Sequence, residues 1–174
     1  MEIEKEIISK IERDYLFVTG KFNLDYKYFI DKINLNISSE NNLNYKTNVI
    51  GKQSVWNLFN KDEQFKYVLY DVFNYLDSIK NIHAYYLDAS WGVKEDQGDY
   101  TRIHDHLPSF LSGIIYLNKH PQKLYLPEIN QEVIPDCGKL VLFSSFLKHY
   151  TKRNSVKEGK YAIAFNLNYT TVSN

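Results

Sequence analysis

Apolar residues recur at helical spacing in the first half of the chain. The clearest stripe runs from about Asp62 to Ile79, with apolar positions three and four residues apart: Phe65, Val68, Leu69, Val72, Phe73 and Leu76. Such a stripe is typical of a helix that packs one face against a core. Ile3, Ile7, Ile8 and Ile11 predict a second, short helix. Residues 21–50 are polar, rich in Asn and without a period, and Ser38–Asn42 predicts a loop.

From about Ile82 the pattern changes to short apolar runs separated by turn residues. The runs predict strands at 83–87, 113–117, 124–126, 132–134, 139–143 and 160–169, and Pro135–Gly138 predicts a turn. A series of strands with no helix between them argues against alternating βαβ units. The sequence therefore predicts a mainly β fold with N-terminal helices, of the jelly-roll or barrel type. We expect one domain over 1–174, with a helical and loop part at 1–80 and a β core at 81–174.

Charge and composition exclude several classes of function. The chain carries 21 basic and 21 acidic residues, and this balance argues against a dedicated binder of nucleic acid or anionic membranes. Cys137 is the only cysteine, so no internal disulfide can form. No apolar run reaches membrane-spanning length, and Met1–Lys10 do not resemble a signal peptide. We therefore expect a cytoplasmic protein, whose 15 Tyr and 10 Phe would suit a homo-oligomer surface.

Three of the five histidines have the spacing of a metal site. His104 and His106 are two positions apart, so on an extended backbone both project from one face while Asp105 points away. His149 follows 43 positions after His106. A ligand pair on one strand plus a distant third ligand is the arrangement of a facial triad, which leaves coordination positions open. Surface histidines in a turn before Pro108 would give the same pattern, so the spacing alone leaves both readings open.

Imidazoles bind a metal only when they are neutral. Ordinary histidines therefore predict that metal affinity falls as the pH drops below about 6.5. The remaining two histidines, His83 and His120, are interpreted as structural, since His120 lies in a polar turn beside Pro121.

The predicted last strand has one face that suits a ligand pocket. Small residues lie there beside a cation and two amides: Lys160, Ala162, Ala164, Asn166 and Asn168. A plain solvent-exposed face is the alternative. On another predicted strand Tyr116 shares a face with Ser112 and Ile114, and its hydroxyl is a candidate hydrogen-bond partner for a ligand carboxylate. Lys160, Asn166 and Tyr116 are thus candidate cofactor-binding residues.

Several motifs in a consistent order resemble one family. Thr47–Ser54 resembles the Asn-x-x-Gly-x-x-Ser segment that opens a group of 2-oxoglutarate/iron(II) oxygenases of phages and marine bacteria. Further matches follow at Trp91, Gly98–Tyr100, His104–His106, Pro108–Leu117, Pro135, Gly138, Leu142–His149 and Ala162–Leu167. The resemblance covers about residues 47–168, and several ordered motifs are more specific than any one of them.

The resemblance implies a double-stranded β-helix of the jelly-roll or cupin-like kind. It further implies that His104, His106 and His149 bind iron(II), that 2-oxoglutarate chelates this metal, and that the chain is a hydroxylase-type dioxygenase. The implied substrate is a small molecule or a peptide side chain, and its identity stays open. Most oxygenases of this kind carry H-x-D, so His106 replaces a carboxylate and leaves the iron site more positive by one unit.

A second departure concerns the cation that binds the far carboxylate of 2-oxoglutarate. The family places an Arg about ten residues past the last histidine, where this chain has Lys160 at the eleventh position after His149. Lysine keeps the charge but lacks the bidentate fork of arginine. Arg153 is a competing candidate for the same role.

Two other functions stay open. A three-histidine iron dioxygenase that does not use 2-oxoglutarate would need no cation at Lys160. A non-catalytic cupin-like module that binds a ligand would hold no iron tightly and form no succinate, since one fold hosts many functions.

Overall fold

The computed structural model describes residues 13–39, 47–79 and 83–171. Within these ranges the strands form three sheets. The largest has six antiparallel strands, in the order β1 (Phe17–Lys21), β9 (Lys139–Ser144), β6 (Leu111–Tyr116), β11 (Lys160–Thr171), β4 (His83–Glu95) and β3 (Lys52–Gln53). A three-stranded sheet contains β10 (Tyr150–Thr151), β7 (Leu124–Leu126) and β8 (Gln131–Val133), and β2 (Val49–Ile50) pairs with β5 (Tyr100–Thr101). A short 3₁₀ turn, Pro127–Ile129, follows β7.

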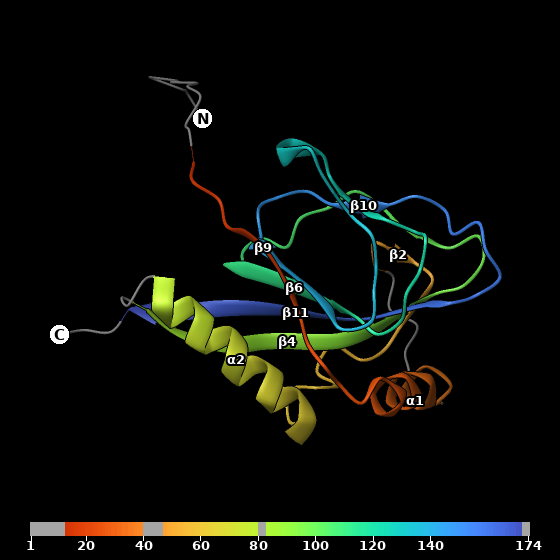
Figure 1. The fold of residues 1–174 in the computed structure, drawn as a ribbon, viewed down its shortest axis with the longest axis horizontal. Coiled ribbons are helices and arrows are strands. Elements are labelled where there is room, and N and C mark those ends of the chain that lie inside the picture. The colour runs from red at the N-terminus through yellow and green to blue at the C-terminus, as the bar shows by residue number, and fades with distance from the viewer. Residues whose placement is uncertain (1–12, 40–46, 80–82, 172–174) are drawn as a thin grey trace, which may run out of the picture.

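The described part of the chain is built in layers (Figure 1). The helices α1 (Tyr26–Ile37) and α2 (Glu63–Ile79) lie on one side of the six-stranded sheet, and the smaller sheets lie on the other. Strand β11 shows how the sequence sets these layers. Ile163, Phe165 and Leu167 are buried in the core that contains the helix residues, whereas Ala162 belongs to a second core toward the small sheet. The prediction of a mainly β jelly roll with N-terminal helices is confirmed.

Helix α2 confirms the clearest prediction from the apolar pattern. Its stripe is buried against the sheet, with Phe65, Val68, Leu69, Val72 and Leu76 in the core. Asp62 directly precedes the helix, and its Oδ1 accepts a hydrogen bond of 2.9 Å from the backbone N–H of Phe65. This bond satisfies a donor that the first turn would otherwise leave unpaired. None of the described helices is long and apolar enough to cross a membrane.

The description of residues 21–50 as aperiodic is wrong, because this range contains a helix. Helix α1 occupies Tyr26–Ile37, and Asp25 caps it by accepting a hydrogen bond of 3.0 Å from the N–H of Tyr28. Phe29 and Ile33 are fully buried, four residues apart on one helix face. Tyr26, Ile30 and Ile37 pack against the same core, so the helical period is present but lies among Lys, Asp and Asn residues.

Helix α1 packs closely against strand β4. A Cβ added at Gly92 would lie 2.3 Å from Cγ1 of Ile33, so only glycine lets the helix approach at this point. Strand β4 itself extends to Glu95, beyond the predicted end at Leu87, and β1 was not predicted. The helix predicted from Ile3–Ile11 lies outside the described residues.

Replacement of Ile33 tests whether α1 belongs to the core. Because Ile33 is fully buried, Ile33→Ala should lower the free energy of unfolding by about 2–5 kcal/mol in urea titrations. The matched control is Leu35→Ala on the same helix, where the side chain is 74% exposed, and it should cost less than about 0.5 kcal/mol. Equal effects of the two substitutions would contradict the packing of α1.

Candidate metal centre

Backbone hydrogen bonds hold the two histidine-bearing segments side by side. His104 and His149 form an isolated antiparallel bridge, in which each N–H donates to the carbonyl of the other at 3.1 and 2.9 Å. The N–H of His106 donates to the carbonyl of Ser145 at 2.8 Å. The segment between β5 and β6 is thereby fixed against the segment that leads into β10. The three histidines of the sequence prediction therefore lie together.

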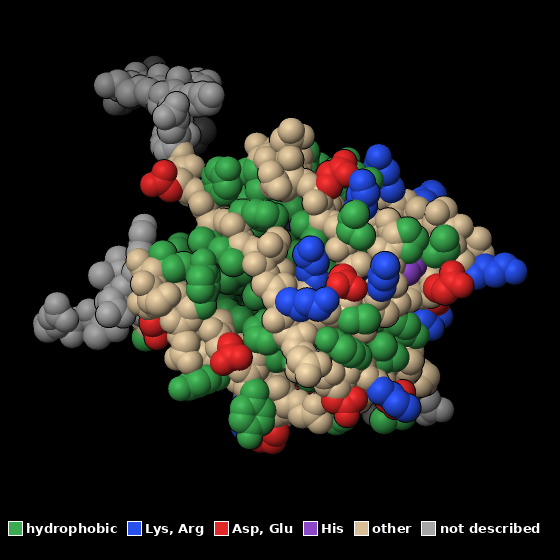
Figure 2. Space-filling view, viewed as in Figure 1, with side chains coloured by type: hydrophobic (Ala, Val, Ile, Leu, Met, Phe, Trp, Pro, Cys, Tyr) green, Lys and Arg blue, Asp and Glu red, His purple; other side chains and the backbone are tan. Residues whose placement is uncertain are grey.

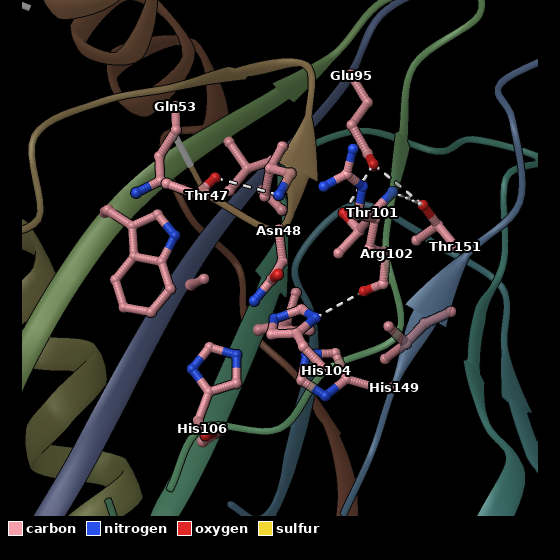
Figure 3. Close-up of a pocket in the computed structure, with 18 of the residues that line it drawn as sticks. Thr47, Asn48, Gln53, Glu95, Thr101, Arg102, His104, His106, His149 and Thr151 are labelled. Carbon is pink, nitrogen blue, oxygen red and sulfur yellow. Dashed lines mark hydrogen bonds between the residues drawn. The ribbon is translucent and has the colours of Figure 1, made fainter. Parts of the chain in front are cut away.

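The three imidazoles face one another (Figure 3). One potential ligand atom from each of His104, His106 and His149 lies within 4.8 Å of the others. The ring centroids are 4.4 to 5.0 Å apart. Nitrogen ligands about 2.1 Å from a shared ion at right angles would be about 3 Å apart, so modest side-chain rotation closes the site. The donor set fits a metal such as iron.

Backbone carbonyls orient two of the imidazoles. Nδ1 of His104 lies 2.8 Å from the carbonyl oxygen of Arg102, and Nδ1 of His149 lies 3.3 Å from that of Leu147. A carbonyl oxygen only accepts, so each Nδ1 carries the proton and each Nε2 keeps its lone pair for a metal. Because these partners are main-chain atoms, no residue type in the sequence could have revealed them.

His106 is held by side chains instead. The indole of Trp91 stacks on its ring, with centroids 5.8 Å apart and an interplanar angle of 20°. Asn166 forms a hydrogen bond with His106, and its Oδ1 also accepts from the Ser112 hydroxyl at 3.0 Å. The predicted face of β11 thus reaches the metal ligands at Asn166.

Burial keeps the imidazoles in the neutral form that binds metals. Loss of hydration lowers the pKa of His149 well below its usual value, with a further contribution from the nearby His106 and His104. The same cause lowers the pKa of His106 to about 4 and also lowers that of His104. The cluster is therefore neutral at physiological pH.

A cavity of about 530 Å³ opens onto the three histidines. Its walls include the face of β11 with Ala162 and Ala164, and the face of β6 with Ser112, Ile114 and Tyr116. These are the two faces that the sequence predicted to line a pocket. Trp56, which is 40% exposed, and Arg102 also line the cavity. Basic and acidic side chains are interspersed on the surface shown in Figure 2, in keeping with the zero net charge.

Lys160 lies in this cavity, where it forms an ion pair with Glu95. Both side chains are almost fully buried. Oε1 of Glu95 also accepts hydrogen bonds from the hydroxyls of Thr101, at 2.9 Å, and Thr151, at 3.0 Å (Figure 3). Burial lowers the pKa of Lys160, and the negative charge of Glu95 opposes that shift.

The sequence analysis missed Glu95. The residue lies opposite Lys160 in the antiparallel register of β4 and β11. This pairing depends on the last part of β4, which the sequence pattern did not reveal. A single acidic residue at the end of an unrecognised strand gives no signal of its own.

The other candidate cofactor residues divide between the cavity and the surface. Tyr116 is buried in the cavity wall, where burial raises its pKa, and its ring centroid lies 6.0 Å from Nζ of Lys160. Arg153 is exposed outside the cavity, where it donates to the carbonyl of Gly98 at 3.0 Å and lies over the ring of Tyr100. Of the two candidate cations for the far carboxylate of 2-oxoglutarate, only Lys160 therefore lies in the cavity.

The two remaining histidines lie apart from the cluster. His120 is buried, with Nε2 lying 3.1 Å from the carbonyl of Glu158 and Nδ1 accepting from the N–H of Gln122. These contacts fit the structural role expected for it. The side chain of His83 lies outside the described residues.

Comparison with known proteins gives similarity in structure only. No known family matches this sequence, and no curated protein matches it. The viral collagen prolyl hydroxylase of Paramecium bursaria Chlorella virus-1, solved with 2-oxoglutarate, has a TM-score of 0.66 at 15% identity, over 87% of this chain and 94% of its own. A prolyl-4-hydroxylase of Pseudomonas putida has a TM-score of 0.64 at 11% identity, over 90% and 93%.

A third similar structure is HygX from Streptomyces hygroscopicus with nickel, 2-oxoglutarate and hygromycin B bound. Its TM-score is 0.63 at 12% identity, over 90% of this chain and 83% of HygX. At such low identities the likeness establishes the fold, which is the double-stranded β-helix of 2-oxoglutarate/iron(II) oxygenases. The expected fold class is confirmed, and the activity has to be argued from the site.

The lowered pKa values change the expected pH dependence of metal binding. Protons compete with a metal only when the pH approaches the pKa of the metal-free ligand. Since burial lowers the pKa of all three imidazoles, affinity should begin to fall at a lower pH than the value of about 6.5 expected for ordinary histidines. Anaerobic equilibrium dialysis with iron(II) at several pH values measures this, with circular dichroism as the control for folding. A fall in iron(II) affinity that already begins at pH 6.5 would contradict the lowered pKa values, because it would show that the imidazoles are hydrated as in free histidine.

Proposed function

We propose that this chain is an iron(II)-dependent oxygenase that uses 2-oxoglutarate as co-substrate. The observation that carries the proposal is a set of three neutral imidazoles inside a cavity that also contains a buried lysine. Three protein ligands leave coordination positions open for a bidentate co-substrate and dioxygen. A closed set of four ligands would instead favour a structural metal.

Known structures of the same fold support the choice of metal and co-substrate. HygX is described with iron bound, and with nickel and 2-oxoglutarate bound. The viral prolyl hydroxylase is described as a 2-oxoglutarate complex. Imidazole is a suitable ligand for both iron and nickel, so the donor set of this chain agrees with both. The narrower resemblance to oxygenases of phages and marine bacteria rests on the ordered motifs over 47–168.

Each part of the cavity has a role in this function. His104, His106 and His149 would hold the iron, which supplies the activation of dioxygen that is coupled to oxidative decarboxylation of the co-substrate. Lys160 would attract the far carboxylate of that co-substrate, next to the ring of Tyr116. Trp91 covers one face of His106, and Phe143 packs edge-on against His149, so both rings limit the access of water to the ligands.

The substrate would enter where the cavity opens. Trp56 contacts Trp91 edge-to-face with centroids 4.6 Å apart, and Arg102 lies beside His104. An aromatic pair and a cation suit a small molecule or a peptide side chain. HygX is described with the small molecule hygromycin B, which agrees with a substrate of this size class.

One observation favours a second candidate function. Lys160 is already neutralised by Glu95, whereas a free cation would bind a dicarboxylate best. A three-histidine iron dioxygenase that needs no 2-oxoglutarate is therefore the alternative.

A spectroscopic titration separates the two candidates. Under anaerobic conditions, 2-oxoglutarate added to the iron(II) protein should produce the weak visible charge-transfer band of a chelated complex. His149→Ala should abolish the band. Mutation of a residue that only hydrogen-bonds to a metal ligand typically weakens metal binding about 10- to 100-fold, and loss of a ligand itself should cost more. His120→Asn, a histidine substitution outside the cavity, should keep it.

Iron binding without the band would favour the second candidate. No iron binding by the wild-type protein would contradict both, and the chain would then be a ligand-binding module of the same fold.

A further inference from the structure

Glu95 occupies the end of the cavity that lies away from the histidines. Its carboxylate has three partners: the ammonium of Lys160 and the hydroxyls of Thr101 and Thr151. All four of these residues line the cavity that also contains the metal ligands. Figure 3 shows Glu95 and its two threonines on one side of the cavity and the three imidazoles on the other.

The distance between the two ends matches a short 2-oxo acid. His149 and Thr151 are two residues apart in the segment that enters β10, which corresponds to about 7 Å of extended chain. Thr151 in turn donates to Glu95. A five-carbon 2-oxo acid spans about 5 Å between its end carbons. An acid of this length that chelated a metal held by the histidines would extend along the cavity toward Glu95 and Lys160.

The placement of charge works against a second carboxylate at that end. The three histidines carry no negative charge, and the carboxylate nearest to them in the cavity wall is Asp105, which accepts from the N–H of Leu107. The far end already contains one carboxylate, and a dicarboxylate would bring a second one next to the same lysine. Like charges that share a buried site repel strongly, because little water separates them.

We propose that Glu95 sets the co-substrate specificity of the site by competing with the far carboxylate of 2-oxoglutarate for Lys160. The inference rests on the proposed function and deepens it. The proposed function names 2-oxoglutarate alone as co-substrate. The inference widens this to straight-chain 2-oxo acids of four or five carbons, with or without a second carboxylate. Glu95 acts through Lys160, so it is a specificity-determining residue that takes no part in the chemistry.

The test compares two acids that differ only at the far end. Iron(II)-loaded protein is titrated without oxygen with 2-oxoglutarate and with 2-oxopentanoate, and binding is followed by calorimetry, which needs no turnover. In the wild-type protein the two affinities should agree within about tenfold. Glu95→Gln removes the competing charge. The affinity for 2-oxoglutarate should therefore rise by at least about tenfold, while the affinity for 2-oxopentanoate stays unchanged.

The chain offers a matched control at the neighbouring position. Asp96→Asn removes the same charge one residue further on, where Asp96 pairs with Lys52 and Lys94 outside the cavity. This variant should leave the ratio of the two affinities unchanged. If Glu95→Gln does not fold, the ratio of the two affinities in the wild-type protein alone tests the role of Glu95.

A wild-type preference for 2-oxoglutarate of more than about 100-fold would overturn the role of Glu95 and leave the proposed function intact. A ratio that Glu95→Gln does not change would also overturn it. Failure of both acids to bind the iron-loaded protein would overturn the proposed function, and the inference with it.

Discussion

The candidate site depends on one backbone interaction, the bridge between His104 and His149. Neither residue belongs to a long strand, yet two reciprocal hydrogen bonds and a third from His106 to Ser145 fix the segments against each other. The bridge determines which side chains can meet, because residues paired across antiparallel strands project from the same face. It also places Thr151 toward Glu95, since Thr151 lies two residues beyond His149. Both ends of the cavity are therefore positioned by the same short pairing, while the layers of helix and sheet keep it rigid.

Two carboxylates line the cavity, Asp105 beside the histidines and Glu95 beside Lys160. The three histidines are neutral, because each has a lowered pKa. At the other end of the cavity, Glu95 forms an ion pair with Lys160 across the register of β4 and β11. Most oxygenases of this fold would hold the metal with one carboxylate ligand and the co-substrate with an unpaired basic residue. In this chain the metal would meet three neutral ligands, and the co-substrate would meet a lysine that is already paired.

The sequence predicted the parts of the structure that depend on local patterns. The stripe of α2, the alternation along β11 and the spacing of His104 and His106 each reflect the period of one element. Helix α1 was missed because the Lys, Asp and Asn residues between its core-facing positions make the segment polar on average. The end of β4, and with it Glu95, was missed because the pairing with Lys160 is a matter of register between segments 65 residues apart. The hydrogen bonds that orient His104 and His149 come from main-chain carbonyls, which no side-chain pattern encodes.

The central claim is that His104, His106 and His149 bind one metal ion together. X-ray absorption spectroscopy of the anaerobic iron(II) protein tests it most directly, because multiple scattering from imidazole rings counts the histidine ligands. The account predicts three imidazole nitrogens at about 2.0–2.2 Å, with oxygen ligands completing the coordination. A spectrum with one imidazole or none, or with sulfur in the coordination shell, would contradict it.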